Sequence, residues 1–127
     1  MTARRATTAA IALCLSAFVG LLHSRPAMAG YGAVAYDQDA RKIGAAWDQD
    51  SQKAANEAAL RDCASDGCSV RFNVAPAMCG AIATPDKGGA WGGSVRKTLD
   101  AAKFAAIKNC QKNAKAQCTV RESQCNK

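Results

Sequence analysis

Two short segments, YGAVAY at residues 31–36 and CGAIAT at residues 79–84, decide the fold of this 127-residue chain. Both read Gly, Ala, a branched aliphatic residue and Ala at their centre, and they lie 48 residues apart. Self-similarity at a fixed spacing marks a repeated structural unit. We therefore predict that the chain folds as two similar halves, each of which begins with one of these segments as a short strand.

The repeat extends through both halves. Three further blocks recur at nearly the same spacing, and five of thirteen positions are identical in the longest block. Each half, about 30–78 and 79–127, therefore reads as strand, turn, second strand, helix and third strand. The recurring pairs are Gly44–Trp47 with Gly88–Trp91, Ser51–Cys63 with Thr98–Cys110, and Cys68–Arg71 with Cys118–Arg121.

The second strand of each half is predicted to end at a tryptophan, Trp47 or Trp91, because the repeat aligns these two residues. Aromatic side chains dominate the cores of small domains. We therefore expect the two tryptophans to be symmetrically paired core residues rather than ligand platforms.

The two helices are predicted to begin at Ser51 and Thr98 and to run to the next cysteine. A side-chain oxygen at each start can accept a free backbone N–H and cap the helix. We predict an α+β domain of two pseudo-symmetric β-β-α-β halves, in which both helices pack against one antiparallel sheet of about six strands. The predicted packing faces carry Ala55, Ala59 and Cys63 in the first helix and Leu99, Ala102, Ala106 and Cys110 in the second.

The first 29 residues have the three parts of a secretory signal peptide. Arg4 and Arg5 form a short basic region, residues 9–22 are uncharged and mostly apolar, and Ala27-Met28-Ala29 is an A-x-A cleavage site. The apolar run has 14 residues, fewer than the roughly 20 that a membrane-spanning helix needs. We predict cleavage after Ala29, a single disulfide-bonded domain of residues 30–127 without a transmembrane segment, and a secreted or periplasmic location.

Six cysteines follow the predicted cleavage site, and an even number in a short exported chain indicates a disulfide framework. Zinc sites favour closer cysteine pairs and often include histidine, whereas the only histidine, His23, lies in the predicted signal peptide. We therefore predict no metal site and no cofactor. Equivalence of the halves predicts the bridges Cys63–Cys68 and Cys110–Cys118, with Cys79 and Cys125 left to pair across the halves.

The combination of these features resembles one known family. The features are the YGAVAY opening, the tryptophan-bearing second strand, the Ala-rich helix ending in cysteine, the C-x4-C-x-V step and the later CGAIA segment. Together they are similar to the bacterial secreted domain of unknown function 4189, over essentially all of residues 30–127. The resemblance implies a small exported bacterial domain with paired cysteines, and it implies no reaction, cofactor or catalytic residue.

Carboxylates are the side chains that could still support a reaction. Nucleophilic catalysis by serine or cysteine needs a base beside the nucleophile, and residues 30–127 contain no histidine. Asp37-Gln38-Asp39 and Asp48-Gln49-Asp50 flank the first predicted hairpin, where they could bind calcium or act as acid and base. Aspartate is also common in turns and at helix starts, so a solvated hairpin end competes with this hypothesis. The alternative function is therefore a small exported hydrolase that uses Asp37, Asp39, Asp48 or Asp50.

The charge is unevenly spread over the chain. Residues 30–79 carry five basic and seven acidic side chains, and residues 80–127 carry nine and three, giving net charges of −2 and +6. Phe104 lies toward the lysine side of the second helix, whereas its repeat partner, Glu57, suits a solvated position. An apolar ring in place of a carboxylate on an outer face indicates a partner surface. The predicted surface consists of Arg96, Lys97, Phe104, Ile107, Lys108, Lys112 and Lys115.

These observations predict an exported, non-enzymatic binding module that engages a protein or an acidic envelope component through its basic second half. A hydrolase inhibitor and an envelope or host-interaction protein both belong to this class. Binding of nucleic acid or another anionic polymer ranks last, because the charge is modest and no stacking platform is evident. The residues of this alternative are Arg96, Lys97, Lys103, Lys108, Lys112 and Lys115.

Overall fold

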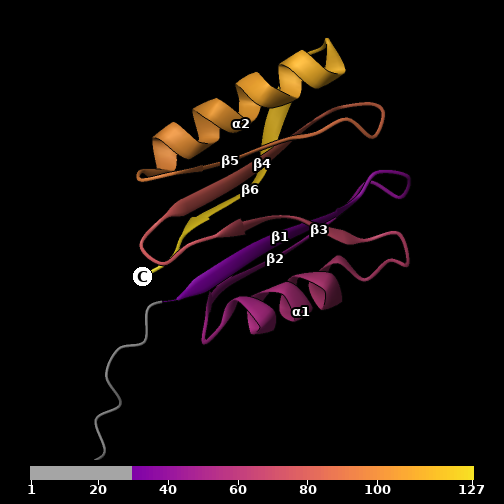
Figure 1. Ribbon diagram of the computed structural model, residues 1–127. Helices are drawn as coiled ribbons and strands as arrows, with labels where there is room; N and C mark the ends of the chain where they lie inside the picture. Colours follow the sequence, from indigo (N-terminus) through magenta and orange to yellow (C-terminus); the bar gives the residue numbers. More distant parts are fainter. Residues whose placement is uncertain (1–29) are drawn as a thin grey trace, which may run out of the picture.

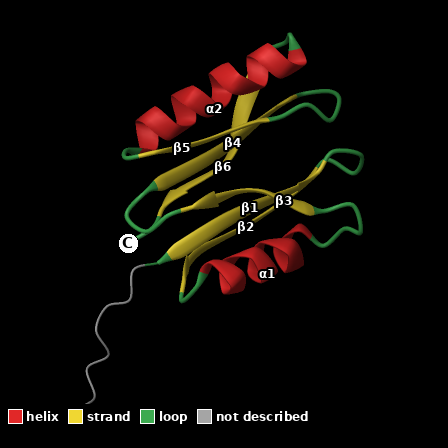
Figure 2. Cartoon of the chain, viewed as in Figure 1, coloured by secondary structure: helices red, strands yellow, loops and turns green. Residues whose placement is uncertain are grey.

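Residues 30–127, the range that the computed structural model describes, form four layers in the order helix, sheet, sheet, helix (Figure 1). Each half supplies one helix and one three-stranded sheet, and the two sheets face each other at the centre (Figure 2). The predicted signal peptide, residues 1–29, lies outside this range. The elements are β1 Tyr31–Asp37, β2 Lys42–Gln49, α1 Gln52–Cys63, β3 Ser69–Val74, β4 Cys79–Pro85, β5 Gly92–Arg96, α2 Leu99–Ala114 and β6 Cys118–Cys125.

The α+β class, the two β-β-α-β halves and the disulfide staples are confirmed, but the prediction of a single six-stranded sheet is wrong. β1 lies between β2 and β3 in one antiparallel sheet, and β4 lies between β5 and β6 in the other. One sheet with both helices on the same face would leave Val34, Tyr36 and Ile82 in water. Stacking the two sheets instead buries these three side chains completely, and removal of apolar surface from water stabilises the fold.

The two central strands require this stacking because they are apolar on both faces. In β1 the two alanines lie under α1, while Val34 and Tyr36 face the other sheet. In β4 the two alanines lie under α2, while Ile82 faces the first sheet. Successive side chains alternate between the faces of a strand. Each central strand therefore places small residues under its helix and larger residues between the sheets.

Each helix approaches its sheet until backbone meets backbone at a glycine. A Cβ atom on Gly44 of β2 would overlap the carbonyl oxygen of Ala59 and the amide nitrogen of Cys63 in α1. A Cβ atom on Gly92 of β5 would overlap the equivalent atoms of α2. Glycine is therefore the residue that fits both positions.

The strand register corrects the predicted alignment of the second strands. Gly44 pairs with Ala35, and Gly92 pairs with Ala83. The two glycines are thus equivalent at a spacing of 48 residues, the same as that of the opening segments, rather than the 44 that the Gly-Ala-Trp resemblance suggested. The glycines at 88 and 89 lie in the turn before β5, so their likeness to the β2 sequence is coincidental.

The tryptophans are core residues, as predicted, but they are not symmetry partners. Trp47 lies inside β2 and Trp91 precedes β5, so neither residue ends a strand. Both are half-buried and pack against the core between the sheets. Trp91 stacks on Phe72 of the other sheet with ring centroids 6.4 Å apart, which joins the two halves.

The helix starts and the disulfide pairs are as predicted. The side-chain oxygens of Ser51 and Thr98 accept the N–H groups of the third residue on, at 3.0 and 3.2 Å. α1 ends at its cysteine, whereas α2 continues beyond Cys110 to Ala114. The third bridge joins β4 to β6 inside the second sheet. The expectation that it crosses between the halves is therefore wrong, although its two cysteines are the predicted pair. The bridges are Cys63–Cys68, Cys79–Cys125 and Cys110–Cys118.

Three buried clusters among residues 30–127 hold the layers together, and we expect this segment to fold on its own. Neither of its two helices has the length and apolar character needed to cross a lipid bilayer.

Because helix and strand backbones are so close at Gly44 and Gly92, one added methyl group at either residue should lower the stability of the fold substantially. Gly92→Ala should lower the free energy of unfolding by about 1–3 kcal/mol, because the added carbon forces α2 away from β5. Gly88→Asn is the matched control, since a Cβ at residue 88 meets open space and asparagine tolerates a positive φ, so its cost should stay below about 1 kcal/mol. Urea unfolding of the oxidised protein measures both, and equal losses would contradict this account of the helix–sheet contact.

Candidate functional site

Helix α2 covers the second sheet and turns its opposite side to solvent (Figure 1). Ala102, Ala106 and Cys110 are buried against the sheet. At 100° per residue, Phe104 and Lys108 lie on the other side of the helix. The Phe104 side chain is 64% exposed, the largest exposed fraction of any large apolar residue among residues 30–127.

Phe104 and Lys108 form one local unit. They are four residues apart, so they are neighbours on the helix surface. The Lys108 Nζ atom lies 5.2 Å from the centroid of the Phe104 ring, within the range of a cation–π interaction. Such a contact at an exposed site contributes about 0.5–1 kcal/mol, so Lys108 can leave the ring readily when a partner approaches.

The structure divides the predicted partner surface. Ile107 packs against the buried cluster between α2 and its sheet, so it belongs to the core. Lys115 caps the helix with a left-handed backbone, φ 52°, and Arg96 is the last residue of β5. The other exposed lysines of the prediction and Phe104 form what we call the basic face, which consists of Lys97, Phe104, Lys108, Lys112 and Lys115. The exposed Asp100 and Gln111 lie on the same side of α2.

The equivalent helix of the first half has a different outer face. Glu57 of α1 stands at the position of Phe104, and Arg61 stands at the position of Lys108. α1 carries two basic and two acidic side chains, whereas α2 carries three basic and one acidic. The two helices share the same buried residues but differ outside, so the fold does not require the basic face.

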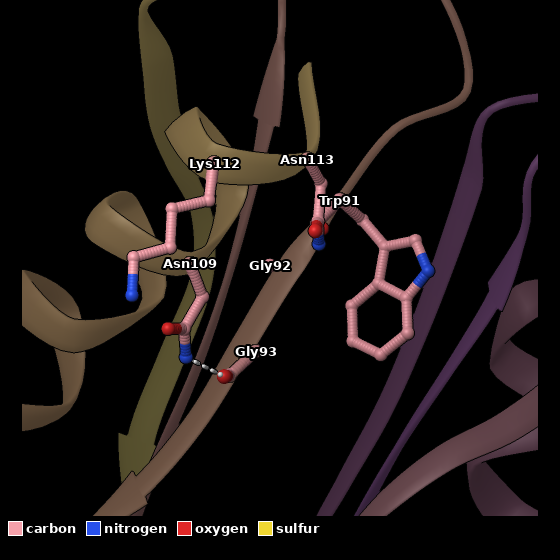
Figure 3. A pocket seen from close by; sticks show the side chains of 6 residues that line it. All are labelled: Trp91, Gly92, Gly93, Asn109, Lys112 and Asn113. Carbon is pink, nitrogen blue, oxygen red and sulfur yellow. Dashed lines mark hydrogen bonds between the residues drawn. The ribbon is translucent and has the colours of Figure 1, made fainter. Parts of the chain in front are cut away.

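A shallow pocket of about 270 Å³ lies on the flank of α2, beside β5 (Figure 3). Asn109 Nδ2 donates to the Gly93 carbonyl oxygen at 2.9 Å, and Asn113 Nδ2 donates to the Trp91 carbonyl oxygen at 2.7 Å. The two amides therefore satisfy carbonyls along an edge strand. The Trp91 indole points away from Lys112 (Figure 3), so it offers no stacking surface there.

The two asparagines were not among the residues predicted from the sequence. Their spacing of four residues, on the side of α2 that faces β5, was the available signal. α1 places Asp62 at the position of Asn109, and its carboxylate accepts the N–H of Ala45 on the edge strand β2 at 2.9 Å. Both halves thus use the same helix position to bind the backbone of an edge strand.

Asp37 is buried at the end of β1, where it holds two turns together. Its carboxylate accepts hydrogen bonds from the Ser65 hydroxyl and from the amides of Asp39 and Ala40, the latter two at 3.0 and 3.1 Å. The Ser65 hydrogen bond, followed by that of Ala40, favours the charged carboxylate and lowers the pKa of Asp37 below its ordinary value. A carboxylate that is fully hydrogen-bonded in its charged form is poorly suited to proton transfer near neutral pH.

The predicted carboxylate pairs lie at opposite ends of the first hairpin. Asp37 lies beside its turn, and Asp48 lies near the far end of β2, about 20 Å away along the strand. Asp48 has a left-handed backbone, φ 53°, and its Oδ1 accepts the backbone N–H of Lys127 at 2.7 Å. Asp39 and Asp50 are exposed. The structure does not bring the four carboxylates together, and residues 30–127 contain no group of three side chains placed to hold a metal ion.

The fold and the paired cysteines define a small, disulfide-stapled α+β domain with one basic outer helix. The chain belongs to the DUF4189 family, a domain of unknown function whose family model matches residues 31–125. The NMR structure of Rv1813c from Mycobacterium tuberculosis is similar, with 25% sequence identity, a TM-score of 0.57, and coverage of 99% of this chain and 98% of that chain. No curated protein matches the chain.

The hydrogen bonds of Asp37 predict a pH-dependent contribution to stability. Its folded-state pKa lies below the unfolded value of about 3.9, so its stabilising effect is present above that value and is lost as the pH falls through the folded-state pKa. Asp37→Asn should therefore lower the free energy of unfolding at pH 7, and the gap to the wild type should narrow at pH 3. Urea unfolding at both pH values measures this, with Asp39→Asn as the control in the same turn. If the difference in free energy of unfolding between Asp37→Asn and the wild type were larger at pH 3 than at pH 7, the lowered pKa of Asp37 would be contradicted.

Proposed function

We propose that residues 30–127 act outside the cytoplasm as a non-enzymatic binding module, whose basic face engages a protein or an acidic envelope component. The observation that supports this best is the exposed Phe104 ring among lysines, at a position where α1 carries Glu57. An exposed aromatic side chain gains most when a partner removes it from water.

The rest of the fold supports a binding role because it holds the basic face on a rigid base. α2 is fixed to its sheet by the contact at Gly92, by the two asparagines and by the Cys110–Cys118 bridge. A surface that is already ordered loses little conformational entropy on binding.

A location outside the cytoplasm has two supports. The three disulfides are of the kind that persists in oxidising compartments, and the predicted signal peptide agrees with them. The hydrolase alternative has less support than the binding module, because its carboxylates lie at opposite ends of a hairpin and Asp37 and Asp48 bind the backbone.

Capture of partners from cell-envelope and culture extracts tests the binding module. The oxidised segment 30–127 should retain a partner that the double variant Phe104→Glu, Lys108→Glu loses, because the variant removes the ring and reverses the charge. The matched control is Leu60→Glu, Arg61→Glu on α1, which changes the net charge by the same amount in the opposite outer layer.

The outcomes separate the alternatives. Loss of the partner with the α2 variant alone supports a binding surface on α2. Equal retention by both variants, or no retention by the wild type, would count against the module. Retention of nucleic acid that disappears steeply with added salt would favour the anionic-polymer alternative.

A further inference from the structure

Four lysines supply the positive charge of the basic face, and the exposed Arg96 precedes Lys97 in the chain. α2 contains three lysines and no arginine. The one ion pair among residues 30–127 joins Arg121 to Asp86, so no lysine of the basic face forms an ion pair. The exposed Asp100 lies one turn before Phe104 on the same side of α2 and offsets part of this charge. Protein–protein interfaces are enriched in arginine and depleted in lysine, whereas the flexible ammonium groups of lysine suit the diffuse charge of an anionic lipid surface.

The Phe104 ring is isolated from other exposed apolar side chains. Leu60, the other large apolar residue exposed among residues 30–127, lies on α1 in the opposite outer layer (Figure 1). Protein hot spots are clusters of residues in desolvated pockets, and a single ring among lysines supplies no such cluster. Helices that lie on membrane surfaces place bulky apolar side chains beside lysines, and α2 offers one such ring because its apolar face packs on its own sheet.

The outer side of α2 also has a shape that can lie against a flat surface. α2 has 16 residues, a length of about 24 Å, and it forms the outermost layer of the second half (Figure 1). Of the residues of the basic face, Lys112 lines the pocket beside β5, and none lines the pocket between the loops at Asp86 and Gln117. Phe104 and Lys108 therefore lie on the exposed side of α2, outside both pockets.

We propose that the basic face docks the protein peripherally on an anionic phospholipid bilayer. Phe104 enters the boundary between headgroups and acyl chains, and the surrounding lysines lie over the headgroup phosphates. This inference rests on the proposed binding function and specifies its partner as a lipid surface rather than an acidic protein.

Vesicle co-sedimentation provides the first test. The oxidised segment 30–127 should bind vesicles of equal parts phosphatidylglycerol and phosphatidylcholine at low salt, and should not bind pure phosphatidylcholine. Each basic residue near an anionic surface contributes roughly a fivefold change in partitioning, so Lys108→Glu should weaken binding roughly twentyfold or more. Arg61→Glu on α1 changes the net charge equally and should have a much smaller effect.

A tryptophan probe tests the insertion of residue 104. The variant Phe104→Trp should be quenched by phosphatidylglycerol with brominated acyl chains. The native Trp47 and Trp91 are half-buried and pack against the core between the sheets, so the wild type should be quenched much less than the variant. Glu57→Trp on α1 is the matched control and should also remain unquenched.

Three results would overturn the lipid proposal: no binding to anionic vesicles, equal losses in Lys108→Glu and Arg61→Glu, or equally tight binding of soluble polyglutamate. If vesicles fail but extracts still yield a partner that depends on Phe104, the binding module stands with a protein partner. If vesicles fail and extracts yield nothing, the proposed function falls as well. Circular dichroism of each variant confirms that it is folded.

Discussion

The contact between helix backbone and strand backbone at Gly44 and Gly92 sets the dimensions of the whole molecule. A helix this close leaves room only for alanine beneath it, which is why both central strands place alanine on that face. Alanine buries little surface, so each helix–sheet half has a thin core. The larger residues, Val34, Tyr36 and Ile82, lie on the other face and stabilise the fold only when the two sheets stack.

The buried residues of the two halves are equivalent, whereas the residues on their outer faces differ. In each sheet the register between the central strand and the third strand of the half shifts by one residue, and that extra residue is an arginine. Its side chain donates a hydrogen bond to the equivalent residue of the central strand in both halves. Arg71 donates to the carbonyl oxygen of Tyr36, and Arg121 donates to the Thr84 hydroxyl. A difference on the outer face, such as Phe104 for Glu57, has no counterpart in the packing and is where a function can differ between the halves.

Much of this fold could be predicted from local sequence. The helix caps and the disulfide pairs follow from short-range spacing and from the repeat, and the exposure of Phe104 follows from the polar character of its repeat partner, Glu57. The stacking of two sheets was missed, although strands 31–36 and 79–84 lack the polar alternation of a strand with one solvated face. The alignment of Trp47 with Trp91 was wrong because Gly88 and Gly89, which lie in a turn, resemble the sequence of β2 around Gly44. The role of Asp37 depends on Ser65, which lies 28 residues away, so no local pattern could reveal it.

Polar side chains at both ends of the stacked sheets are engaged in contacts between the two halves. At one end of the stacked sheets, Arg41 donates to the carbonyl oxygens of Pro85 and Asp86, which joins the two hairpin turns. At the other end, the buried Asn126 side chain donates to the carbonyl oxygens of Val74 and Ala75 and accepts the N–H of Asp48. These polar groups hold the halves together and have little left to offer a partner. The sheet faces are covered and α1 carries balanced charge, so a side chain on the outer side of α2 can change without disturbing the packing of the fold.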